Sequence, residues 1–490
     1  MLFYLDDIRF KYELEKLART VLPFERFQFT ENIHDITADS EYFKIQSAER
    51  LLTEIKVDGK KETREREKTT EDFNENELQL ALMLFDCIYK ISGYRSSWGI
   101  LTGIRPAKLL GKLIASDGID SAIDYFKNTF LVSSKKTELC LECNRSERAI
   151  VERSTPDSFS LYISVPFCPS RCNYCSFVSH SVEQAKRLIP RYVELLCEEI
   201  KSTAKIAKDL KLVLRTVYIG GGTPTTLSAE QLTEVFDTVS ASFDLSNIEE
   251  YTVEAGRPDT VTKEKLIAIS KSGATRISIN PQTMNDQVLK NIGRRHTVAE
   301  TVEAFKLARE CGFNNINTDL IAGLSGDTFE SFQRSVDEII KLNPENVTVH
   351  SLSMKRASNL TKSQTVFDIK EGETASKMVD YAREKLTENG IKPYYMYRQS
   401  KTVGNLENVG YAKPGFECLY NVYIMDETHT ILACGASAVT KLREPYGNNI
   451  ERIFNYKYPY EYIERFGDIL DRKQKIFEFY AQYSRDVCKN

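Results

Sequence analysis

Histidine, tryptophan and long apolar runs are scarce in this chain of 490 residues. Only five histidines occur, and none stands in a His-Glu-x-x-His pair, which excludes that common signature of a catalytic zinc site. No apolar run approaches the roughly 18 residues that a membrane-spanning helix needs. The opening apolar stretch, MLFYL, is also too short for a signal peptide. We therefore expect neither a membrane span nor an export signal.

A strong charge of either sign is also lacking, because the formal net charge is only −4. Polyanionic partners are usually matched by strongly basic domains, so we expect no nucleic-acid partner. The composition, 41% hydrophobic and 28% charged, is typical of a soluble globular protein. Eleven cysteines scattered through a large chain indicate reduced thiols in a cytoplasmic protein rather than a disulfide framework.

The middle of the chain alternates between apolar strands and helical patterns. We predict strands at 161–165, 215–220, 250–255, 275–280, 315–322 and 346–352, and helices at 185–207, 229–242, 263–271, 298–311 and 328–342. Such alternation favours a parallel sheet covered by helices, an α/β fold. Six units are too few for a closed eight-fold barrel, so we expect a partial (β/α)6 barrel with its chemistry at the carboxyl ends of the strands.

The two flanks do not follow this alternation. Residues 1–155 mix short strand patterns with helices and predict an N-terminal α+β domain. Residues 156–355 form the barrel, and residues 356–490 are expected to form a C-terminal α+β domain that covers the barrel mouth. In this last region we predict a helix at 373–389, strands at 392–398, 421–425 and 429–433, and a helical end.

Three cysteines follow the first barrel strand in the string FCPSRCNYCSF. Cys168, Cys172 and Cys175 are separated by three residues and then by two. A structural zinc site normally has four protein ligands, and no fourth is evident nearby. A disulfide within Cys-x-x-Cys would leave Cys168 unexplained. Three thiolates suit a [4Fe–4S] cluster with one iron left open for an exchangeable ligand.

Polar residues and glycines follow the other predicted strands. Gly221, Gly222 and Thr223 end the second strand, and a glycine run lets another group approach the backbone closely. The third, fourth and fifth strands are accompanied by further polar side chains, and one guanidinium lies in the string IGRRH: Glu254, Gln282, Asp319 and Arg294. Each signal is weak alone, but together they would bind a polar zwitterion that carries a ribose.

These motifs resemble the radical S-adenosylmethionine superfamily. The strings LYISVPFCPSRCNYC, IGGGTPTTL and GASA are similar to the oxygen-independent coproporphyrinogen III oxidase family. WGILTGIRPAK and NVGYAKPGFECLYN are similar to the long-chain branch of that family, the coproporphyrinogen dehydrogenases. The resemblance covers nearly the whole chain and is densest from 161 to 324.

The resemblance implies a specific chemistry. A [4Fe–4S] cluster on the three cysteines would bind S-adenosylmethionine, and an electron from a donor such as flavodoxin or ferredoxin would cleave it to a 5′-deoxyadenosyl radical. That radical would remove hydrogen from the propionates of a tetrapyrrole, coproporphyrinogen III, on the way to protoporphyrinogen IX. Tyr162 would be the functional tyrosine upstream of the cysteines. The implied cofactor contacts are Phe177, Gly221, Gly222, Thr223, Glu254, Gln282, Arg294 and Asp319.

Two positions differ from the best-known oxidases of this family. Those enzymes carry a fourth cysteine where this chain has Phe177, and a histidine where it has Ser164. The phenylalanine is shared with the haem-chaperone branch, but that branch typically has a His-Asn-x-x-Tyr-Trp string, and the only tryptophan here is Trp98. A haem chaperone without turnover, or a radical enzyme that acts on another tetrapyrrole, is therefore the alternative.

Four other cysteines and three basic residues are further candidates for a functional role. Cys140 and Cys143 form a Cys-x-x-Cys pair, but the segment reads as a helix without a partner pair, which favours a structural role. Cys418 and Cys434 are expected to be buried as small apolar residues. Candidates for the tetrapyrrole carboxylates, chosen because they are basic, are Arg105, Lys108 and Arg398.

Overall fold

A computed structural model describes residues 1–175, 180–353, 369–399 and 401–484. The chain divides into two compact units. Unit 1 consists of residues 1–144, 351–380 and 396–408, and unit 2 of residues 145–350, 381–395 and 409–490. The division into three domains at 155 and 355 stays a prediction. Among the described residues, no helix has the length and apolar character needed to cross a membrane.

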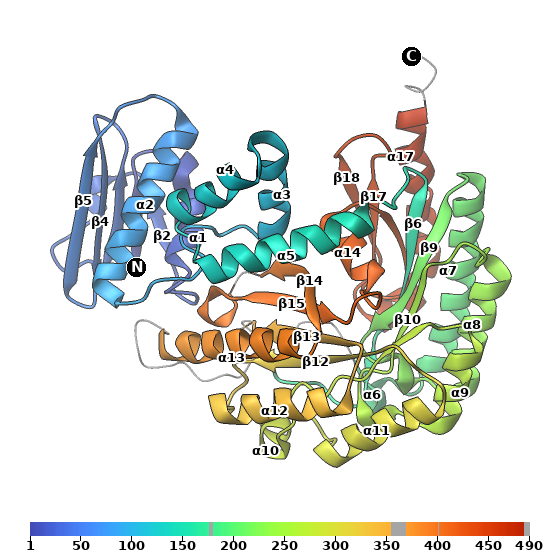
Figure 1. Cartoon of the computed structure of the whole chain (residues 1–490). Helices are drawn as coiled ribbons and strands as arrows, with labels where there is room; N and C mark the ends of the chain where they lie inside the picture. Colours follow the sequence, from blue (N-terminus) through green and yellow to red (C-terminus); the bar gives the residue numbers. More distant parts are fainter. Residues whose placement is uncertain (176–179, 354–368, 400, 485–490) are drawn as a thin grey trace. The chain divides into compact units, whose positions relative to one another are not determined.

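Unit 1 begins with a five-stranded sheet in the order β2-β1-β3-β4-β5. Its strands are β1 (Leu2–Leu5), β2 (Gln28–Thr30), β3 (Tyr42–Gln46), β4 (Arg50–Val57) and β5 (Lys60–Glu67). Along β4 buried residues alternate with partly exposed ones, which is the pattern of a strand with one covered face. Helix α2 (Phe73–Ser92) covers that face, and α1 (Lys11–Ala18) packs beside it (Figure 1). The predicted N-terminal α+β character is confirmed.

The described residues that follow this sheet in unit 1 are mainly helical, around one ordered loop. Helices α3 (Pro106–Asp117), α4 (Ile119–Asp124), α5 (Ser134–Val151) and α13 (Ile369–Glu388) follow, the last two crossing into unit 2. The loop before α3 carries Trp98, which is fully buried. The Trp98 indole Nε1 donates to Glu407 at 2.8 Å, and the same carboxylate accepts from Lys136 at 2.6 Å. This buried pair fixes the loop, because each charged group finds its partner inside the protein.

Unit 2 contains most of an eleven-stranded sheet in the order β14-β15-β13-β12-β11-β10-β9-β6-β16-β17-β18. The six predicted barrel strands are all confirmed: β6 (Ser158–Val165), β9 (Val213–Gly221), β10 (Glu250–Glu254), β11 (Arg276–Ser278), β12 (Ile316–Ala322) and β13 (Asn346–Ser351). From β6 to β12 neighbouring strands pair in parallel. The other strands are β14 (Lys392–Arg398), β15 (Glu407–Ala412), β16 (Thr430–Cys434), β17 (Val439–Arg443) and β18 (Ile450–Phe454).

Helices cover one face of this sheet, as the alternation predicted. The covering helices include α7 (Ile189–Asp209), α8 (Ala229–Ser242), α9 (Lys263–Lys271), α11 (Val298–Glu310) and α12 (Phe329–Leu342), of which α7, α8 and α9 stand side by side along the outer side of β6, β9 and β10 (Figure 1). Ser228 and Thr297 form capping boxes that start α8 and α11. Short helices complete this unit: α6 (Val182–Ala185), α10 (Asp286–Asn291), α15 (Pro459–Glu464), α16 (Phe466–Lys473) and α17 (Lys475–Ser484).

One predicted strand is wrong. Residues 421–425 lie in helix α14 (Leu419–Asp426), not in a strand. The aromatic and β-branched run there favours a strand locally, but tertiary contacts override that preference. Glu250 accepts hydrogen bonds from the backbone N–H groups of Leu419 and Tyr420, which start the helix. The strand predicted at 429–433 is β16, which pairs in parallel with β6 and extends the barrel sheet beyond six strands.

The two faces of the barrel sheet differ in chemistry. One set of alternate residues, including Leu161, Val217 and Ile277, belongs to the apolar core beneath the helices. The other set is joined by polar contacts across neighbouring strands, such as Thr216 to Ser160 at 2.8 Å and Asn317 to Ser278 at 2.9 Å. We call this second set the polar face of the sheet. A packed (β/α)8 barrel is filled largely by branched apolar side chains, so a polar interior indicates a place for a polar ligand.

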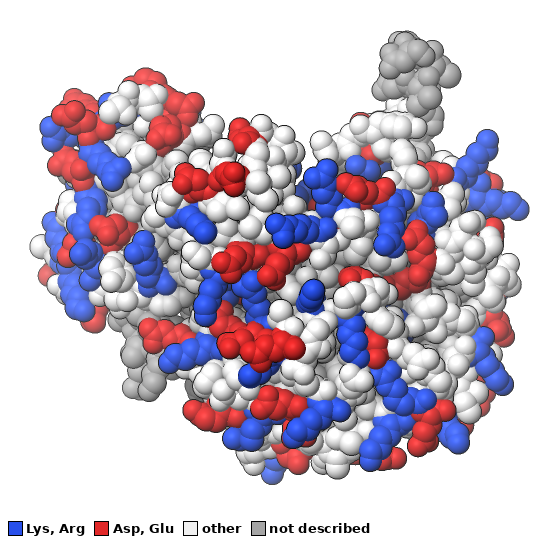
Figure 2. Space-filling model, in the orientation of Figure 1, with Lys and Arg blue, Asp and Glu red and all other residues white. Residues whose placement is uncertain are grey.

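The outer surface carries both charge signs. Lysine and arginine alternate with aspartate and glutamate over the face shown in Figure 2, without a broad area of one sign. This pattern agrees with the small net charge of −4.

Candidate active site

The three cysteines of the motif lie on one loop after β6. Cys168 ends the short strand β7 (Phe167–Cys168), which pairs with β8 (His180–Ser181). The loop then turns so that the Cys175 N–H donates to the Cys172 carbonyl at 3.2 Å. Cys172 is buried, whereas Cys168 and Cys175 are partly accessible. Phe177, a predicted cofactor contact, lies outside the described residues.

A second segment, from 291 to 294, supports this loop. The Ser170 hydroxyl donates to the Gly293 carbonyl at 2.9 Å, and the Asn173 N–H donates to the Ile292 carbonyl at 3.0 Å. The cysteine loop is therefore tied to the string IGRRH, which the sequence places more than a hundred residues away.

Positive charge gathers around Cys172. The Arg257 guanidinium reaches its sulfur at 3.9 Å, and the Arg294 guanidinium is near enough to interact with it electrostatically. Burial would lower the pKa of Arg294, but the facing Tyr174 and Cys172 side chains raise it further, so the guanidinium stays charged. Cationic donors of this kind favour a thiolate over a thiol. At Cys168 the donor is neutral, since the Thr223 hydroxyl lies 3.5 Å from its sulfur.

The glycine run ends β9 directly beside Cys168. Gly221 has a φ of +107°, a conformation that disfavours any residue with a side chain. A Cβ on Gly222 would lie 2.6 Å from the Phe167 carbonyl oxygen and 3.0 Å from the Cys168 sulfur. The glycines are therefore required by the close approach of β9 to the cysteine loop. Thr223, the third predicted contact here, is buried.

Glu254 stands at the carboxyl end of β10, on the polar face of the sheet. The Tyr218 hydroxyl donates to its Oε1 at 2.5 Å. Burial raises the pKa of Glu254 to about 7, despite the lowering effect of that hydrogen bond. Near neutral pH this carboxyl group therefore exchanges readily between its neutral and its charged form, and a bound cation would favour the charged form.

Asp319, on β12, is held in the opposite state. Burial alone would raise the pKa of Asp319, but hydrogen bonding and the charge of His350 lower it below the usual value. His350 Nε2 lies 3.7 Å from Asp319, and Asn317 donates to it at 2.9 Å. The pKa of Glu254 is raised and that of Asp319 is lowered, although both carboxyl groups lie on the same polar face. Near neutral pH one carboxyl therefore changes its protonation state easily and the other stays ionised, an arrangement frequent in functional sites.

The remaining predicted residues are also on this side of unit 2. Gln282 is buried and adopts a left-handed φ of 75°. Its backbone N–H donates to the Asp319 carbonyl, and its carbonyl accepts from the Ile321 N–H. Arg294 donates to the Asn280 carbonyl at 2.6 Å and to the Tyr174 hydroxyl at 3.1 Å. Its Nε is buried without a hydrogen-bond partner among the described residues. A donor in this state is available to a ligand.

Tyr162 takes part in a stack of three tyrosines. Its ring lies 6.3 Å from Tyr218 on β9 and 6.2 Å from Tyr420 on α14, and the latter two rings are 4.5 Å apart. The three planes are nearly parallel, within 24° of one another. Burial raises the pKa of Tyr162, so the phenol stays neutral. Tyr218 belongs to the stack and also donates to Glu254, so it connects Tyr162 with this carboxyl group.

Several residues of this site escape sequence reasoning. Arg257 and Tyr218 could have been found from the alternation of strand ends, because they stand three residues from the predicted Glu254 and Gly221, respectively. His350 could likewise have been found from the end of β13. Tyr420 gave no usable signal, since it stands just before residues 421–425, which were predicted as a strand and not as part of a helix. Among the described residues, no three His, Cys, Asp or Glu side chains close on one point as the ligands of a single metal ion would.

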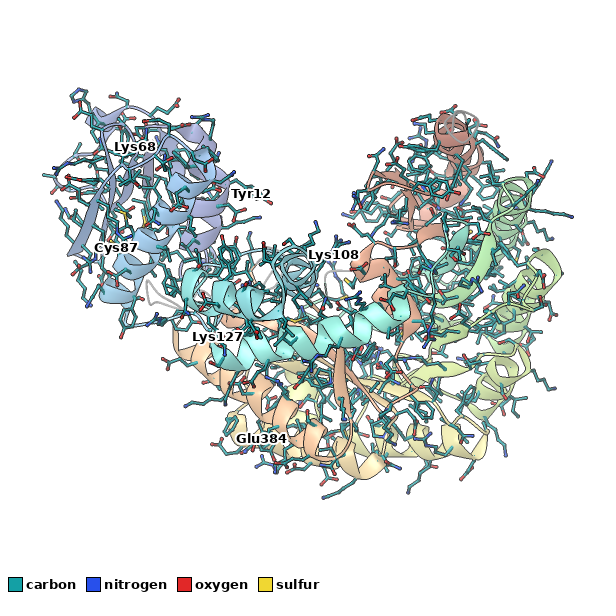
Figure 3. All side chains as sticks on the ribbon, turned by 45° about the horizontal axis from the view of Figure 1, so that its top comes forward. Tyr12, Lys68, Cys87, Lys108, Lys127 and Glu384 are labelled. Carbon is teal, nitrogen blue, oxygen red and sulfur yellow. The ribbon has the colours of Figure 1, made fainter. Side chains whose placement is uncertain are left out.

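The other candidates from the sequence lie elsewhere. Cys140 and Cys143 are fully buried on α5, so the structural interpretation of this pair is favoured. Cys418 and Cys434 are also buried, as predicted. In unit 1, Arg105 stands at the N-cap position of α3, without a capping hydrogen bond from its side chain, and Lys108 lies in the first turn (Figure 3). Arg398 is buried and donates to the carbonyls of Leu101 and Gly103 at 2.5 and 3.4 Å.

Residues 162–339 match the family described as the Radical SAM superfamily. The cofactors of this superfamily are a [4Fe–4S] cluster and S-adenosylmethionine, and they are those of this chain. The residues fit them on their own chemistry. Three thiols share one loop, charged guanidinium groups lie near the Cys172 sulfur, and glycines leave the backbone open beside Cys168.

Comparison with characterised proteins narrows the family. The chain is 40% identical over 412 residues to the oxygen-independent coproporphyrinogen-III oxidase-like protein HemZ of Bacillus subtilis, covering 83% of this chain and 82% of that protein. It is 33% identical to the heme chaperone HemW of Lactococcus lactis, covering 57% of this chain and 69% of that protein. The solved coproporphyrinogen III oxidase HemN of Escherichia coli matches with a TM-score of 0.48 at 21% identity, covering 65% of this chain and 72% of that one. The chain therefore belongs to the radical S-adenosylmethionine superfamily and, within it, to the oxygen-independent coproporphyrinogen III oxidase family.

Proposed function

We propose that this protein is an oxygen-independent coproporphyrinogen III dehydrogenase of haem biosynthesis. The observation that carries the proposal is the match to the oxidase-like protein HemZ, which is both closer and longer than the match to the chaperone HemW. In the proposed reaction, propionate side chains of coproporphyrinogen III become the vinyl groups of protoporphyrinogen IX. Each loses carbon dioxide, one hydrogen atom and one electron.

The chain's own residues would divide the work between holding cofactors and shaping their surroundings. Cys168, Cys172 and Cys175 would hold the [4Fe–4S] cluster. When bound, the cluster and S-adenosylmethionine supply the 5′-deoxyadenosyl radical chemistry, which the protein directs by binding and orientation. The open backbone at Gly221 and Gly222 would let the cofactor approach without a clash.

The polar face of the sheet would bind the polar parts of S-adenosylmethionine. Glu254 would accept from the ammonium group, because a cation favours the charged form of a carboxyl whose pKa is about 7. Asp319, already ionised, would accept from hydroxyl groups, and Gln282 and Thr223 would add neutral polar contacts. The unpartnered Nε of Arg294 would donate to an anionic group such as the cofactor carboxylate.

The tyrosine stack would close the site on one side. Tyr162 is neutral and packed beside Tyr218 and Tyr420, so it would orient the cofactor by contact and hydrogen bonding rather than by acid–base chemistry. We further propose that a low-potential donor such as flavodoxin or ferredoxin reduces the cluster and that the protein acts in the cytoplasm.

The test is an anaerobic turnover assay with the reconstituted protein. S-adenosylmethionine, a strong reductant and coproporphyrinogen III are added, and protoporphyrinogen and 5′-deoxyadenosine are measured together. Formation of both, in proportion, is the expected result. Deoxyadenosine without the porphyrin product would refute coproporphyrinogen as the substrate and leave a radical enzyme that acts on another tetrapyrrole.

A haem chaperone is the second candidate, and specific observations favour it. HemW proteins also match the chain, and Phe177 stands where the chaperone branch has phenylalanine. Against it, that branch typically has a His-Asn-x-x-Tyr-Trp string, whereas the one tryptophan of this chain is Trp98, far upstream. Tight stoichiometric haem binding without any product would decide for the chaperone. The same assay therefore separates the two candidates.

A further inference from the structure

Arg257 is the most enclosed cation near the cysteine loop. Its side chain is only 4% exposed, and it follows Glu254 by three residues, just beyond β10. The guanidinium forms a fork with Asp259, from Nε to Oδ1 and from Nη2 to Oδ2, both at 3.0 Å. Such a two-point pair fixes the plane of the guanidinium as well as its position.

The other edge of the same guanidinium faces the cysteine loop. Nη1 and Nη2 each lie 3.2 Å from the Ser170 hydroxyl, Nη1 lies 3.4 Å from the Ser170 carbonyl, and Nη1 lies 3.9 Å from the Cys172 sulfur. Ser170 in turn donates to the Gly293 carbonyl. Arg257 therefore links the end of β10, the cysteine loop and the 291–294 segment through one planar group.

His296 also lies near Asp259, but it carries no positive charge that could pair with this carboxylate. His296 is buried, and its Nδ1 lies 4.0 Å from Asp259. Burial and the nearby arginines lower the pKa of His296 to about 3, so the imidazole is neutral. Asp259 is therefore neutralised by Arg257, and the pair places a fixed dipole with its positive end toward Cys172.

We propose that Arg257, held by Asp259, is a positioning residue for Cys172 that also makes the cluster easier to reduce. Reduction adds negative charge to the cluster and its thiolates, and a buried cation nearby stabilises that charge strongly because the surroundings are poorly screened. The inference rests on the cysteines holding the cluster, as proposed above, and does not depend on the identity of the substrate.

Arg257 differs in its contacts from Arg294, the other arginine at Cys172. Arg294 also donates to Asn280 and Tyr174 and keeps an unpartnered Nε, so part of it is available to a ligand. Among the described residues, the Arg257 guanidinium hydrogen-bonds to Asp259 and to the cysteine loop. The two arginines therefore divide their roles, with Arg257 serving the cluster loop.

The experiment measures the cluster rather than turnover. The full-length protein and the variants R257M, R257K and D259N are reconstituted without S-adenosylmethionine or tetrapyrrole. Iron and sulfide are then counted, and the ratio of reduced to oxidised cluster is followed by electron paramagnetic resonance in a redox titration. R295M is the matched control, because Arg295 lies next to Arg294 but is exposed and pairs with Glu183.

At the same applied potential, we expect the ratio of reduced to oxidised cluster in R257M to be at least tenfold lower than in the wild type. For a one-electron couple, a tenfold change corresponds to a shift of about 59 mV in the reduction potential. R257K keeps the charge and should recover most of that loss, while its spectrum changes because the fork is gone. D259N removes a negative charge and should raise the ratio several-fold. R295M should match wild type.

A ratio equal to wild type in R257M, or in D259N if R257M fails to assemble a cluster, would overturn the proposal. A smaller ratio in R257K than in R257M would also overturn it, because charge could not then be the cause. If the wild-type protein assembles no cluster, the assignment of the three cysteines fails instead. That outcome is distinguishable because it needs no variant.

Discussion

Two groups of cysteines in this chain share a Cys-x-x-Cys spacing but differ in everything around it. Cys172 and Cys175, with Cys168, lie on a loop beside buried arginines, open glycines and a hydroxyl donor. Cys140 and Cys143 lie one helical turn apart on α5 and are fully buried. The Cys140 sulfur lies 3.8 Å from the thioether sulfur of Met396, an apolar neighbour.

The comparison shows that surroundings, not spacing, decide what a pair of thiols does. A thiolate ligand needs cationic or hydrogen-bonding partners and access to the metal. The loop supplies both, whereas the two thiols of the helix are fully buried. The buried Cys87 on α2 illustrates the opposite limit, since it faces β4 with its sulfur 3.7 Å from the Thr53 carbonyl (Figure 3). Burial raises the pKa of the Cys87 thiol to about 12, which keeps it protonated.

The largest expected effect comes from exchanging one cysteine in each group. C172A should lose the cluster absorbance and essentially all cleavage of S-adenosylmethionine, because three thiolates are needed to hold the cluster. C143A should keep full iron and sulfide content and lose about 1 kcal/mol of stability from the vacated volume. Iron and sulfide analysis with ultraviolet–visible spectra distinguishes the two. A cluster retained in C172A, or lost in C143A, would reverse the comparison.

The sequence predicted the scaffold of the cysteine loop better than its surroundings. Each barrel strand and its covering helix carry a period that can be read locally, and all six strands were located. The contacts of Arg257 with Ser170 and Cys172 join residues more than eighty positions apart, and no local pattern encodes them. The same is true of α14, whose first turn depends on Glu250 from β10. Local periodicity predicts elements, whereas long-range polar pairs require the fold.

The next effect sharpens the role of the open backbone at the loop. In G222A the new Cβ would meet the Phe167 carbonyl at 2.6 Å and Cys168 at 3.0 Å, so the loop must shift. We expect at least tenfold less assembled cluster per protein, measured as sulfide content. The matched control is G256A, where a Cβ would meet no atom within 4 Å. Equal cluster content in the two variants would show that the close approach is not needed.

On the other side of the comparison, the helix that carries Cys140 and Cys143 should respond in stability rather than in iron content. Lys136 on α5 pairs with Glu407, and both side chains are at most 3% exposed. E407Q would leave the buried ammonium with Asp380 alone, at 3.0 Å. We expect a loss of about 3 kcal/mol in the free energy of unfolding, measured with urea, while iron per folded protein stays constant.

The control for E407Q is an exposed pair in the same unit. Glu65 contacts Arg50 at 3.0 Å, but both side chains are about half exposed. E65Q should therefore change the free energy of unfolding by less than about 1 kcal/mol. If the two variants were equally destabilised, the buried pair would be no more important than a surface one. Lost iron in E407Q would instead connect α5 with the cluster.

The smallest expected effect is the pH dependence that Glu254 gives to the free energy of unfolding. The pKa of Glu254 is about 7 in the folded protein, above its ordinary value of 4.5, so folding favours the protonated form. This contribution to stability is complete below about pH 4.5 and is lost as the pH rises through 7. In the cofactor-free protein we expect it to amount to about 2 kcal/mol between pH 5 and pH 8, since Glu254 is partly accessible. E254Q cannot ionise and should lack it.

The measurement is urea unfolding of wild type and E254Q at both pH values. Subtracting the change in unfolding free energy of E254Q from that of the wild type isolates Glu254 from every other titrating group.

The pH dependence of S-adenosylmethionine binding is a further check on the same carboxyl. Binding to the ionised form should weaken about tenfold for each pH unit below 7 in the wild type. In E254Q the binding should be weaker and independent of pH over that range. A wild-type affinity that does not change between pH 5 and pH 8 would show that the ammonium group is held elsewhere, and the cluster site would then owe its selectivity to the cysteine loop alone.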